Sequence, residues 1–243
     1  MVGERLVIVG AQRRMAAEIL PRVSALLEPG GKAVAVSIAG ESGSGKSGLA
    51  VCLAEALVQR NLEVVVLAQD DYFNLPPRTN HDKRRADIAW VGPQEVQLDL
   101  LDEHIRSLKQ CTGLPLVKPL VCFEENQIEH ETLPAGRLDV IIAEGTYTSL
   151  LSNVNLRIFI DRHYRTTRAA RQRRSRDVRE RFTERVLEKE HRLISKHRKL
   201  ADIIVRQGRK REETCCNNTG SVVRNQNSRL CSFAGNDTCR RTI

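Results

Sequence analysis

The segment from Gly40 to Ser47 constrains the fold of this chain more than any other. It reads Gly-Glu-Ser-Gly-Ser-Gly-Lys-Ser and satisfies the phosphate-loop pattern GxxxxGK[ST]. Glycines allow positive φ values and a close approach to phosphates, and successive backbone N–H groups then form a nest for an anion. A buried β-branched segment precedes the loop and apolar residues at helical spacing follow it, which is the context that the pattern requires. The sequence therefore predicts a nucleotide site.

Each part of this loop has an expected task. Lys46 would bridge the terminal phosphates, and Ser47 would offer its hydroxyl to Mg²⁺. The helix that follows adds the positive end of its dipole. The residues expected to bind the nucleotide are Gly40, Glu41, Ser42, Gly43, Ser44, Gly45, Lys46, Ser47 and Gly48. The loop alone does not distinguish a kinase from a GTPase, a helicase or a switch.

Five short apolar segments predict a parallel sheet. Their residues are apolar on both faces, and they alternate with helical segments, so right-handed βαβ units covered by helices are expected. The segments are 32–40, 62–71, 137–145, 154–161 and 201–205. We predict an α/β protein of the P-loop NTPase fold, with a parallel sheet of about five strands and helices on both faces.

Composition divides the chain into three parts. Residues 1–30 predict an N-terminal helical extension that is interrupted near Pro21, and residues 31–206 hold the expected P-loop domain. Residues 207–243 are polar and rich in Asn, and they predict a disordered tail. Because there is no apolar run of about 18 residues and no signal peptide pattern at the start, we expect a cytoplasmic protein without a membrane span.

Two predicted strands end in acidic residues. Asp70 and Asp71 end one strand and Glu144 ends another, at the sheet edge where ligands of such folds bind. One carboxylate could take the proton of an attacking hydroxyl, and another could hold Mg²⁺ directly or through water. The alternative is that these acids only cap the next turn or helix. Asp70 and Glu144 are the candidates for chemistry, and Asp71 is expected to be only their neighbour.

Positive charge is concentrated in residues 162–211, which hold 19 Lys or Arg and 6 Asp or Glu. Arg165, Arg168, Arg171 and Arg174 recur at a spacing of three, which places them along one face of a helix. Three interpretations remain open. The arginines could form a lid that neutralises a transferred phosphoryl group, a solvated helix face, or a surface that contacts RNA. The scarcity of aromatic residues in the segment argues against RNA.

Four ordered elements resemble the uridine kinase and phosphoribulokinase family of P-loop kinases. They are GESGSGKS, QDDYF, AEGTY and the arginine-rich segment, and the resemblance covers residues 33–205. It implies that Asp70, the first acid of its element, is the catalytic base. It also implies a metal-linked role for Glu144 and places Arg168 and Arg171 in a lid over the nucleotide.

The resemblance also suggests where an acceptor would bind. It places Tyr72 beside the substrate and Asp87 on a ribose, with Asp82 as a rival to Asp87. The family's P-x-Y-D element, which helps to hold the base, is replaced here at Val121 and Cys122. This departure weakens the case for uridine itself.

Other reactive or aromatic residues are interpreted as structural. The single Trp90 could stack on a substrate, but we favour a place in the core. The histidines expected to be solvated or structural are His81, His104 and His130. The cysteines expected to be buried free thiols are Cys52, Cys111 and Cys122. The four cysteines after residue 214 lack the spacing of a zinc site.

Together these features predict a kinase that uses ATP and Mg²⁺ to phosphorylate a hydroxyl of a small molecule. A nucleoside is the leading acceptor by resemblance, and a pantothenate- or sugar-phosphate-type kinase is the rival in the same class. Three further interpretations stay open, namely a nucleotide-binding regulator, an RNA-associated NTPase and a degenerate kinase that binds ATP without turnover. We expect no nucleic acid or membrane partner, and assembly into a homo-oligomer stays open.

Overall fold

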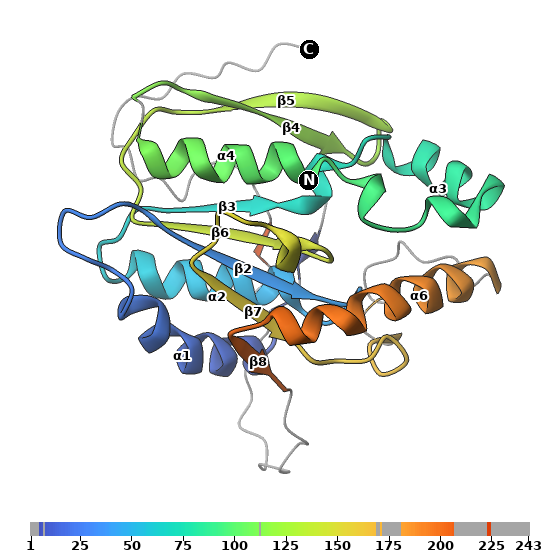
Figure 1. The fold of residues 1–243 in the computed structure, drawn as a ribbon, viewed down its shortest axis with the longest axis horizontal. Coiled ribbons are helices and arrows are strands. Elements are labelled where there is room, and N and C mark those ends of the chain that lie inside the picture. The colour runs from blue at the N-terminus through green and yellow to red at the C-terminus, as the bar shows by residue number, and fades with distance from the viewer. Residues whose placement is uncertain are drawn as a thin grey trace.

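A five-stranded parallel sheet forms the centre of the molecule (Figure 1). The structure is a computed structural model that describes residues 5–6, 8–111, 113–168, 171, 181–206 and 223–224. The strand order is β3–β6–β2–β7–β8. The strands are β2 (Val34–Gly40), β3 (Val64–Ala68), β6 (Val140–Gly145), β7 (Leu156–Ile160) and β8 (Ile203–Val205). The predicted α/β fold and all five predicted strands are confirmed.

Side chains of the central strands pack into two cores, one on each face of the sheet. Val36 and Ile38 of β2 pack in the first core, while Ala35 and Ala39 pack in the second, as the two-residue period of a strand requires. Every residue of β2 and β6 is buried. Strands that bury both faces need apolar residues throughout, which explains their uninterrupted apolar sequences.

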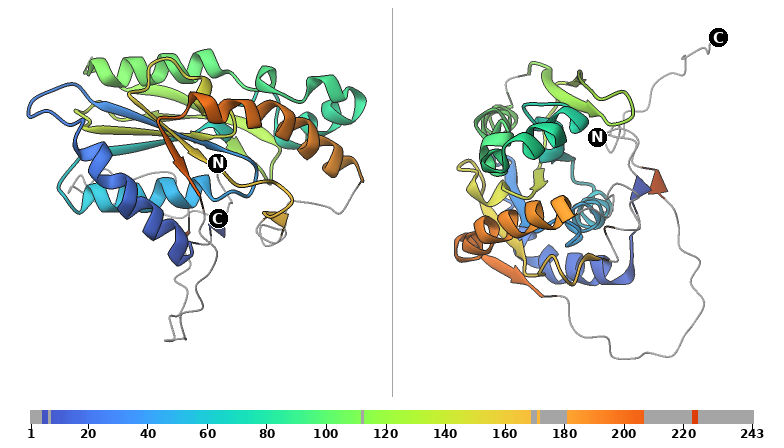
Figure 2. Two further views of the ribbon diagram at one scale, coloured as in Figure 1. Left: turned by 60° about the horizontal axis from the view of Figure 1, so that its bottom comes forward. Right: turned by 90° about the vertical axis from the view of Figure 1, so that its right-hand side faces the viewer.

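Helices cover both faces of the sheet (Figure 2). Helices α1 (Gly10–Ser24) and α2 (Lys46–Val58) pack on the first face. Helices α4 (Leu98–Gln110) and α6 (Arg181–Ile194) contribute Leu101, Ile105 and Ile194 to the core on the other face. Helix α3 (Pro77–Ala86) lies beyond the carboxyl end of the sheet, next to α6. The helical coverage of both faces is thus as predicted.

Short 3₁₀ segments connect these elements. They are η1 (Gln69–Tyr72), η2 (Ile88–Trp90), η3 (Pro93–Glu95), η4 (Thr148–Leu150) and η5 (Ser195–Leu200). Segment η1 carries the predicted acidic pair directly after β3. The end of this strand therefore delivers its acids in a tight turn rather than in extended chain.

The structure departs from the sequence-based expectation in two elements. Helix α1 continues through Pro21 to Ser24, because a proline in the last turn removes little of the helical hydrogen bonding. An antiparallel hairpin of β4 (Leu116–Cys122) and β5 (Gln127–Leu133) was not predicted. It lies beside α4 (Figure 1) and contacts η1 at the end of the edge strand β3.

The two ends of the described chain meet in a small separate sheet. Strand β1 (Arg5–Leu6) pairs antiparallel with β9 (Val223–Arg224). The remainder of the predicted tail, 207–222 and 225–243, lies outside the described residues. No helix in the described part of the chain has both the length and the apolar character that crossing a membrane requires.

Candidate functional site

The phosphate loop joins the end of β2 to the start of α2, as predicted. Gly40, Gly43 and Gly45 have φ values of 151°, 73° and 103°, which side chains rarely adopt. A Cβ atom on Gly43 would also lie 2.7 Å from Cγ of Arg171. Glycine is therefore required at Gly43 both by its backbone conformation and by the close approach of another side chain.

Polar groups of the loop are arranged to receive phosphates. The Nζ of Lys46 donates to the carbonyl of Glu41 over 3.1 Å, so the lysine folds back over its own loop. Ser47 lies half-buried in the first turn of α2, at the positive end of the helix dipole. The buried Oγ of Ser44 has no hydrogen-bond partner among the described residues. An orphaned donor inside an anion nest fits a site built for a phosphate oxygen.

The register of the sheet brings the two candidate acids to the same edge as the loop. Glu144 of β6 lies opposite Ile38 of the loop-bearing β2 on one side and opposite Ala68 of β3 on the other. Asp70 follows Ala68 by two residues, in η1, and is half-buried. The predicted base and the predicted metal residue thus extend from neighbouring strand ends beside the loop.

Glycine at position 145 allows this edge to close tightly. A Cβ on Gly145 would overlap the side chain of Gln69, at 2.2 Å from its Cβ. The Oε1 of Gln69 accepts a hydrogen bond of 2.6 Å from the backbone N–H of Tyr147. The ends of β3 and β6 are therefore locked together, and this contact fixes the positions of the acids next to them.

Asp71 has a structural environment that differs from that of Asp70. It is fully buried, and its carboxylate accepts hydrogen bonds from Nζ of Lys118 and from the backbone N–H of Val121, each over 3.2 Å. Lys118 also pairs with Glu131. Asp71 therefore ties the β4–β5 hairpin to the sheet edge.

The residues predicted to contact an acceptor have other partners in the structure. Tyr72 is fully buried, and its hydroxyl lies 3.0 Å from Nδ1 of His104 in α4. Burial raises the pKa of Tyr72 and lowers that of His104. Asp87 is exposed and accepts a hydrogen bond from the N–H of Ala89 at the start of η2. The structure thus gives Tyr72 a core position and Asp87 a capping position.

Trp90 is half-buried rather than a core residue. Its Nε1 donates to Oδ1 of Asn80 over 2.8 Å. Cys52 and Cys122 are buried, as expected, whereas Cys111 is exposed, so the expectation for Cys111 was wrong. The groups of His, Cys, Asp and Glu in the described residues form no cluster that would hold a metal by itself.

The predicted arginine lid is partly described. Arg171 is buried against the phosphate loop, where Nη1 donates to the carbonyl of Tyr164 and to Oγ1 of Thr167, each over 2.6 Å. Thr167 in turn donates to the carbonyl of Ser42 over 2.9 Å. Arg168 is exposed. The chain after β7 is therefore anchored on the loop through Arg171 and Thr167.

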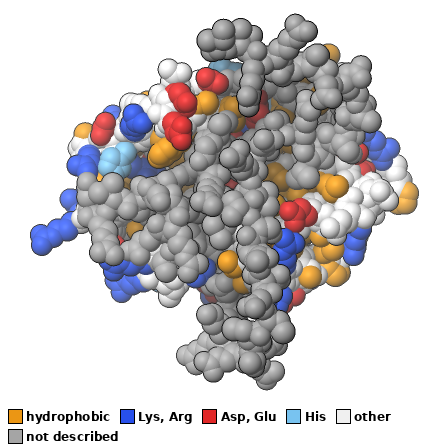
Figure 3. All heavy atoms as spheres, turned by 180° about the vertical axis from the view of Figure 1, so that it is seen from behind, with side chains coloured by type: hydrophobic (Ala, Val, Ile, Leu, Met, Phe, Trp, Pro, Cys, Tyr) orange, Lys and Arg blue, Asp and Glu red, His pale blue; other side chains and the backbone are white. Residues whose placement is uncertain are grey.

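The arginines predicted to share one helix face do not all share it in the structure. Arg165 lies in a turn before the helical residues and is exposed, in contrast to the buried Arg171. Arg174 lies outside the described residues. On the face shown in Figure 3, described acidic, basic and apolar side chains lie interspersed. Basic residues farther along are also paired, since Arg198 and Arg206 both contact Asp161 at 3.3 Å.

Sequence reasoning missed the role of the Glu41 side chain. Its Oε2 accepts a hydrogen bond of 2.5 Å from the N–H of Tyr164, and its Oε1 lies 2.6 Å from Nδ1 of His191 in α6. A variable position of the loop pattern therefore joins the loop to two later elements. The pattern itself carries no signal for this contact, because it specifies only the glycines and the last two residues.

Three successive residues of α6 reach three different parts of the site. Lys189 donates to the carbonyl of Ile88 in η2, Glu190 pairs with Arg84 of α3, and His191 pairs with the loop. The separation between Arg84 Nη2 and Glu190 Oε1 is 3.5 Å. Helix α6 thus connects the phosphate loop to the segment that follows the candidate acids Asp70 and Asp71.

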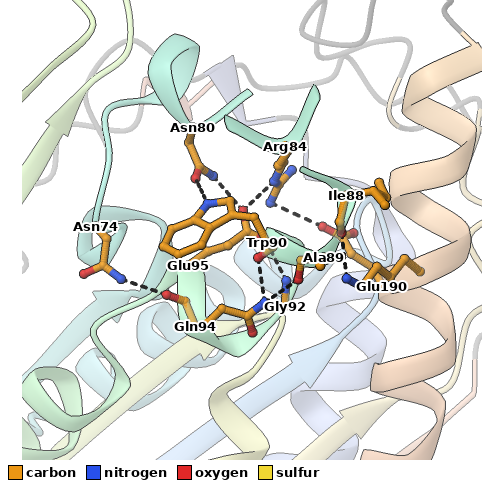
Figure 4. A network of polar contacts seen from close by, with 11 residues as sticks. Asn74, Asn80, Arg84, Ile88, Ala89, Trp90, Gly92, Gln94, Glu95 and Glu190 are labelled. Carbon is orange, nitrogen blue, oxygen red and sulfur yellow. Dashed lines mark hydrogen bonds and ion pairs between the residues drawn. The ribbon is translucent and has the colours of Figure 1, made fainter. Parts of the chain in front are cut away.

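Figure 4 shows the polar network on that side, with Arg84 between Glu95 and Glu190. Glu95 is fully buried and also accepts hydrogen bonds from Asn80 and from the N–H of Gly92. Burial raises the pKa of Glu190. Arg84 and Lys46 oppose this shift, while the charges of Glu95 and Asp70 add to it. Glu190 therefore lies within the electrostatic field of both Lys46 and Asp70.

Proteins of known name match large parts of this chain. A uridine kinase from Shewanella piezotolerans is 29% identical over 192 residues, which cover 73% of this chain and 89% of that protein. A uridine kinase from Ureaplasma urealyticum is 28% identical over 132 residues, or 53% of this chain and 62% of the relative. A bifunctional α-galactosidase/sucrose kinase from Mediterraneibacter gnavus is 27% identical over 186 residues, or 71% of this chain and 20% of the relative. The chain thus spans less than two thirds of the last two relatives.

Solved structures share the fold at lower identity. A possible uridine kinase from Bacillus stearothermophilus has a TM-score of 0.54 and 19% identity, covering 79% of this chain and 97% of its own. The phosphoribulokinase from Rhodobacter spheroides has a TM-score of 0.54 and 14% identity, covering 72% and 70%. These likenesses confirm the P-loop fold.

One family model accounts for most of the chain. It matches residues 35–212, a range that contains the phosphate loop, Asp70, Glu144 and helix α6. The match thus includes every element that the structure gathers at the carboxyl edge of the sheet. The chain therefore belongs to the phosphoribulokinase / uridine kinase family.

Proposed function

We propose that this protein is a kinase that transfers the γ-phosphoryl group of ATP, as its Mg²⁺ complex, to a hydroxyl of a small molecule. The observation that carries this proposal is the sheet register, which puts Glu144 on the strand next to the loop-bearing β2 and Asp70 just after the strand beyond it, at the same carboxyl edge. A second carboxylate at this edge, besides the one that would hold Mg²⁺, is what proton abstraction from an acceptor hydroxyl requires. Membership of the family supports the same reaction class.

The nucleotide would be held by groups already oriented in the structure. Backbone N–H groups of the loop and Lys46 would bind the phosphates, and the orphaned Oγ of Ser44 fits a phosphate oxygen. Ser47 and Glu144 would hold Mg²⁺, which neutralises charge on the transferred group when it is bound. Arg171 lies on the loop and would add positive charge there, and Arg168 would join it from its exposed position.

In the transfer step, Asp70 would accept the proton of the attacking hydroxyl. A new O–P bond forms to the acceptor oxygen while the bond between the γ-phosphorus and its bridging oxygen breaks, and ADP leaves with that electron pair. Positioning and charge stabilisation supply most of the catalysis in such reactions. The proton transfer itself is worth about 10²- to 10⁴-fold.

A nucleoside is the first candidate acceptor, supported by the relatives named uridine kinase. A free sugar is the second candidate. The partial match to a sucrose kinase favours it, and so does the hairpin, where Val121 and Cys122 are buried and apolar in place of a base-holding pair. A sugar phosphate is disfavoured, because Arg84 already pairs with Glu95 and Glu190.

The test is ADP release from Mg·ATP by the full chain across a panel of nucleosides, free sugars, pantothenate and sugar phosphates, with an acceptor-free control. Stimulation by one acceptor class, with formation of its phosphorylated product, is the expected result. A flat panel with ATP still bound would contradict the proposal. In that case a regulator or a degenerate kinase would be the better description.

A further inference from the structure

The hydroxyl of Tyr147 is a buried polar group without a partner. Tyr147 follows β6 by two residues, and its side chain is 1% exposed. Among the described residues, no group forms a hydrogen bond with its hydroxyl, and Nε2 of Gln69 nearby is also unpartnered. Buried phenol hydroxyls in folded proteins nearly always have a partner. The structure thus contains a donor and acceptor that a bound molecule could satisfy.

The surroundings of this hydroxyl connect it to the site of phosphoryl transfer. Burial raises the pKa of Tyr147, and the negative charges of Glu190 and Glu95 raise it further, while Arg84 opposes them. The same Glu190 carboxylate lies in the field of Lys46 and Asp70. Tyr147 also donates its backbone N–H to Gln69, the residue before Asp70, so it lies at the same sheet edge as the predicted base.

The two residues that flank Glu190 in α6 hold it in position. Its neighbours Lys189 and His191 are held by the carbonyl of Ile88 at 2.6 Å and by Glu41 at 2.6 Å. Its own Oε1 lies 3.5 Å from Arg84, a separation longer than a good hydrogen bond. Glu190 is only 9% exposed and is loosely paired, so its carboxylate keeps capacity to accept hydrogen bonds from a ligand.

These groups select an uncharged ligand rich in hydroxyls. A carboxylate accepts hydrogen bonds from hydroxyl groups, and a phenol both donates to them and accepts from them. Arg84 is shared by Glu95 and Glu190, and Lys118 is shared by Asp71 and Glu131. Because Arg84 and Lys118 are already paired, they would not neutralise an anionic acceptor. Such an acceptor would lie next to carboxylates, and like charges are unfavourable in a buried site.

We propose that Glu190 and Tyr147 bind hydroxyl groups of the acceptor that neighbour the hydroxyl being phosphorylated, and that the acceptor is an uncharged polyhydroxylated ring. The ring is either the ribose of a nucleoside or a free sugar. This inference rests on the proposed kinase function and adds the residues that recognise its acceptor. Neither residue belongs to the phosphate loop or to the acids predicted from the sequence.

The experiment uses the full chain and three variants, Tyr147→Phe, Glu190→Gln and the control Glu188→Gln. Glu188 lies on the same helix, is exposed, and pairs locally with Arg192. Initial rates are measured with uridine, fructose and sucrose as neutral acceptors, and with pantothenate and ribulose 5-phosphate as anionic ones. Binding of Mg·ATP is measured separately by calorimetry, and melting curves confirm that each variant is folded.

We expect one neutral acceptor to be phosphorylated and its KM to rise about tenfold in Tyr147→Phe and in Glu190→Gln, as the loss of a hydrogen bond to a ligand predicts. The Kd of Mg·ATP should stay within about twofold, and Glu188→Gln should behave as the unaltered protein. Whether uridine or a sugar is consumed identifies the ring. A purely structural role would lower the melting temperature and leave KM unchanged.

Three results would overturn the inference. An unchanged acceptor KM in both variants, with the reaction otherwise intact, removes the two residues from the acceptor site but leaves the kinase function standing. Preferred turnover of an anionic acceptor contradicts the ligand class. Absence of any phosphorylated product refutes the proposed function and the inference together. If Glu190→Gln does not fold, Tyr147→Phe decides the outcome, because it removes a single atom.

Discussion

At the scale of single residues, Asp70 and Asp71 show how neighbours in sequence receive different tasks. Asp70 is half-buried at the sheet edge that carries the phosphate loop, whereas Asp71 is fully buried and bonded to Lys118 and to the N–H of Val121. A carboxylate whose oxygens are satisfied inside the protein stabilises the fold. One that keeps access to solvent can take part in a reaction.

The Asp71→Asn variant should therefore lose stability. Removing the charge leaves the buried ammonium of Lys118 with the Glu131 carboxylate and the Pro119 carbonyl, and we expect the free energy of unfolding to fall by about 2–4 kcal/mol. Urea unfolding followed by circular dichroism measures this. The control Asp99→Asn lies on an exposed turn of α4 and should change stability by less than about 0.5 kcal/mol. Equal stability of the two variants would be inconsistent with the buried pair.

A second prediction concerns Gly43 of the phosphate loop. Gly43→Ala should weaken ATP binding by about tenfold or more, because its φ of 73° disfavours a side chain and its Cβ would press on Arg171. Gly113 is a matched control, since it has a φ of 72° and nothing within 4 Å of an added Cβ. Gly113→Ala should lose about 1 kcal/mol of stability and bind ATP normally. Calorimetric titration with Mg·ATP compares them, and equal ATP affinities would contradict the loop geometry.

At the scale of elements, helix α6 is the one whose contacts were hardest to predict from the sequence. Its contacts with η2, α3 and the loop come from three successive residues, so they follow no helical period. The Glu41→Gln variant tests the link to the loop. It removes the charge that pairs with His191, and we expect a stability loss of about 1–3 kcal/mol together with a higher KM for ATP.

Glu55→Gln is the control for that prediction, because Glu55 lies on α2 and pairs with Arg13 at a partly exposed position. It should change neither quantity measurably. Unfolding curves and ATP-dependent initial rates are measured for both variants. If Glu41→Gln matches this control in both measurements, the contact between Glu41 and His191 contributes neither to the free energy of unfolding nor to the use of ATP.

The five central strands were predictable because burial on both faces demands continuous apolar sequence, as in 140–143. The β4–β5 hairpin was not, since Gln127–Leu133 has only two apolar residues, Ile128 and Leu133, and no strand-like alternation. The hairpin depends instead on tertiary contacts through Asp71 and Lys118. The same limit applied to the site. Loop glycines and strand-end acids carry local patterns, whereas Glu190 and Glu41 are joined to the site through partners far away in the chain.

At the scale of the whole molecule, one sheet edge gathers groups from nearly the full described chain. The loop after β2, the acid pair after β3, Glu144 at the end of β6, the anchored segment after β7 and helix α6 all lie at this edge (Figure 1). The parallel order β3–β6–β2–β7–β8 makes this possible, because it directs every carboxyl end toward the same edge. The candidate site is therefore formed jointly by several elements at this sheet edge, and no single element contains it.

The most direct test of the proposed kinase compares the unaltered protein with Asp70→Asn in two assays, acceptor-dependent ADP release and calorimetric binding of Mg·ATP. Asparagine keeps the size of the side chain but cannot take a proton, so we expect turnover to fall by about 10²- to 10⁴-fold while ATP binding is retained. Unchanged turnover in Asp70→Asn, with a folded protein and intact ATP binding, would refute the assignment of Asp70 as the base of a small-molecule kinase.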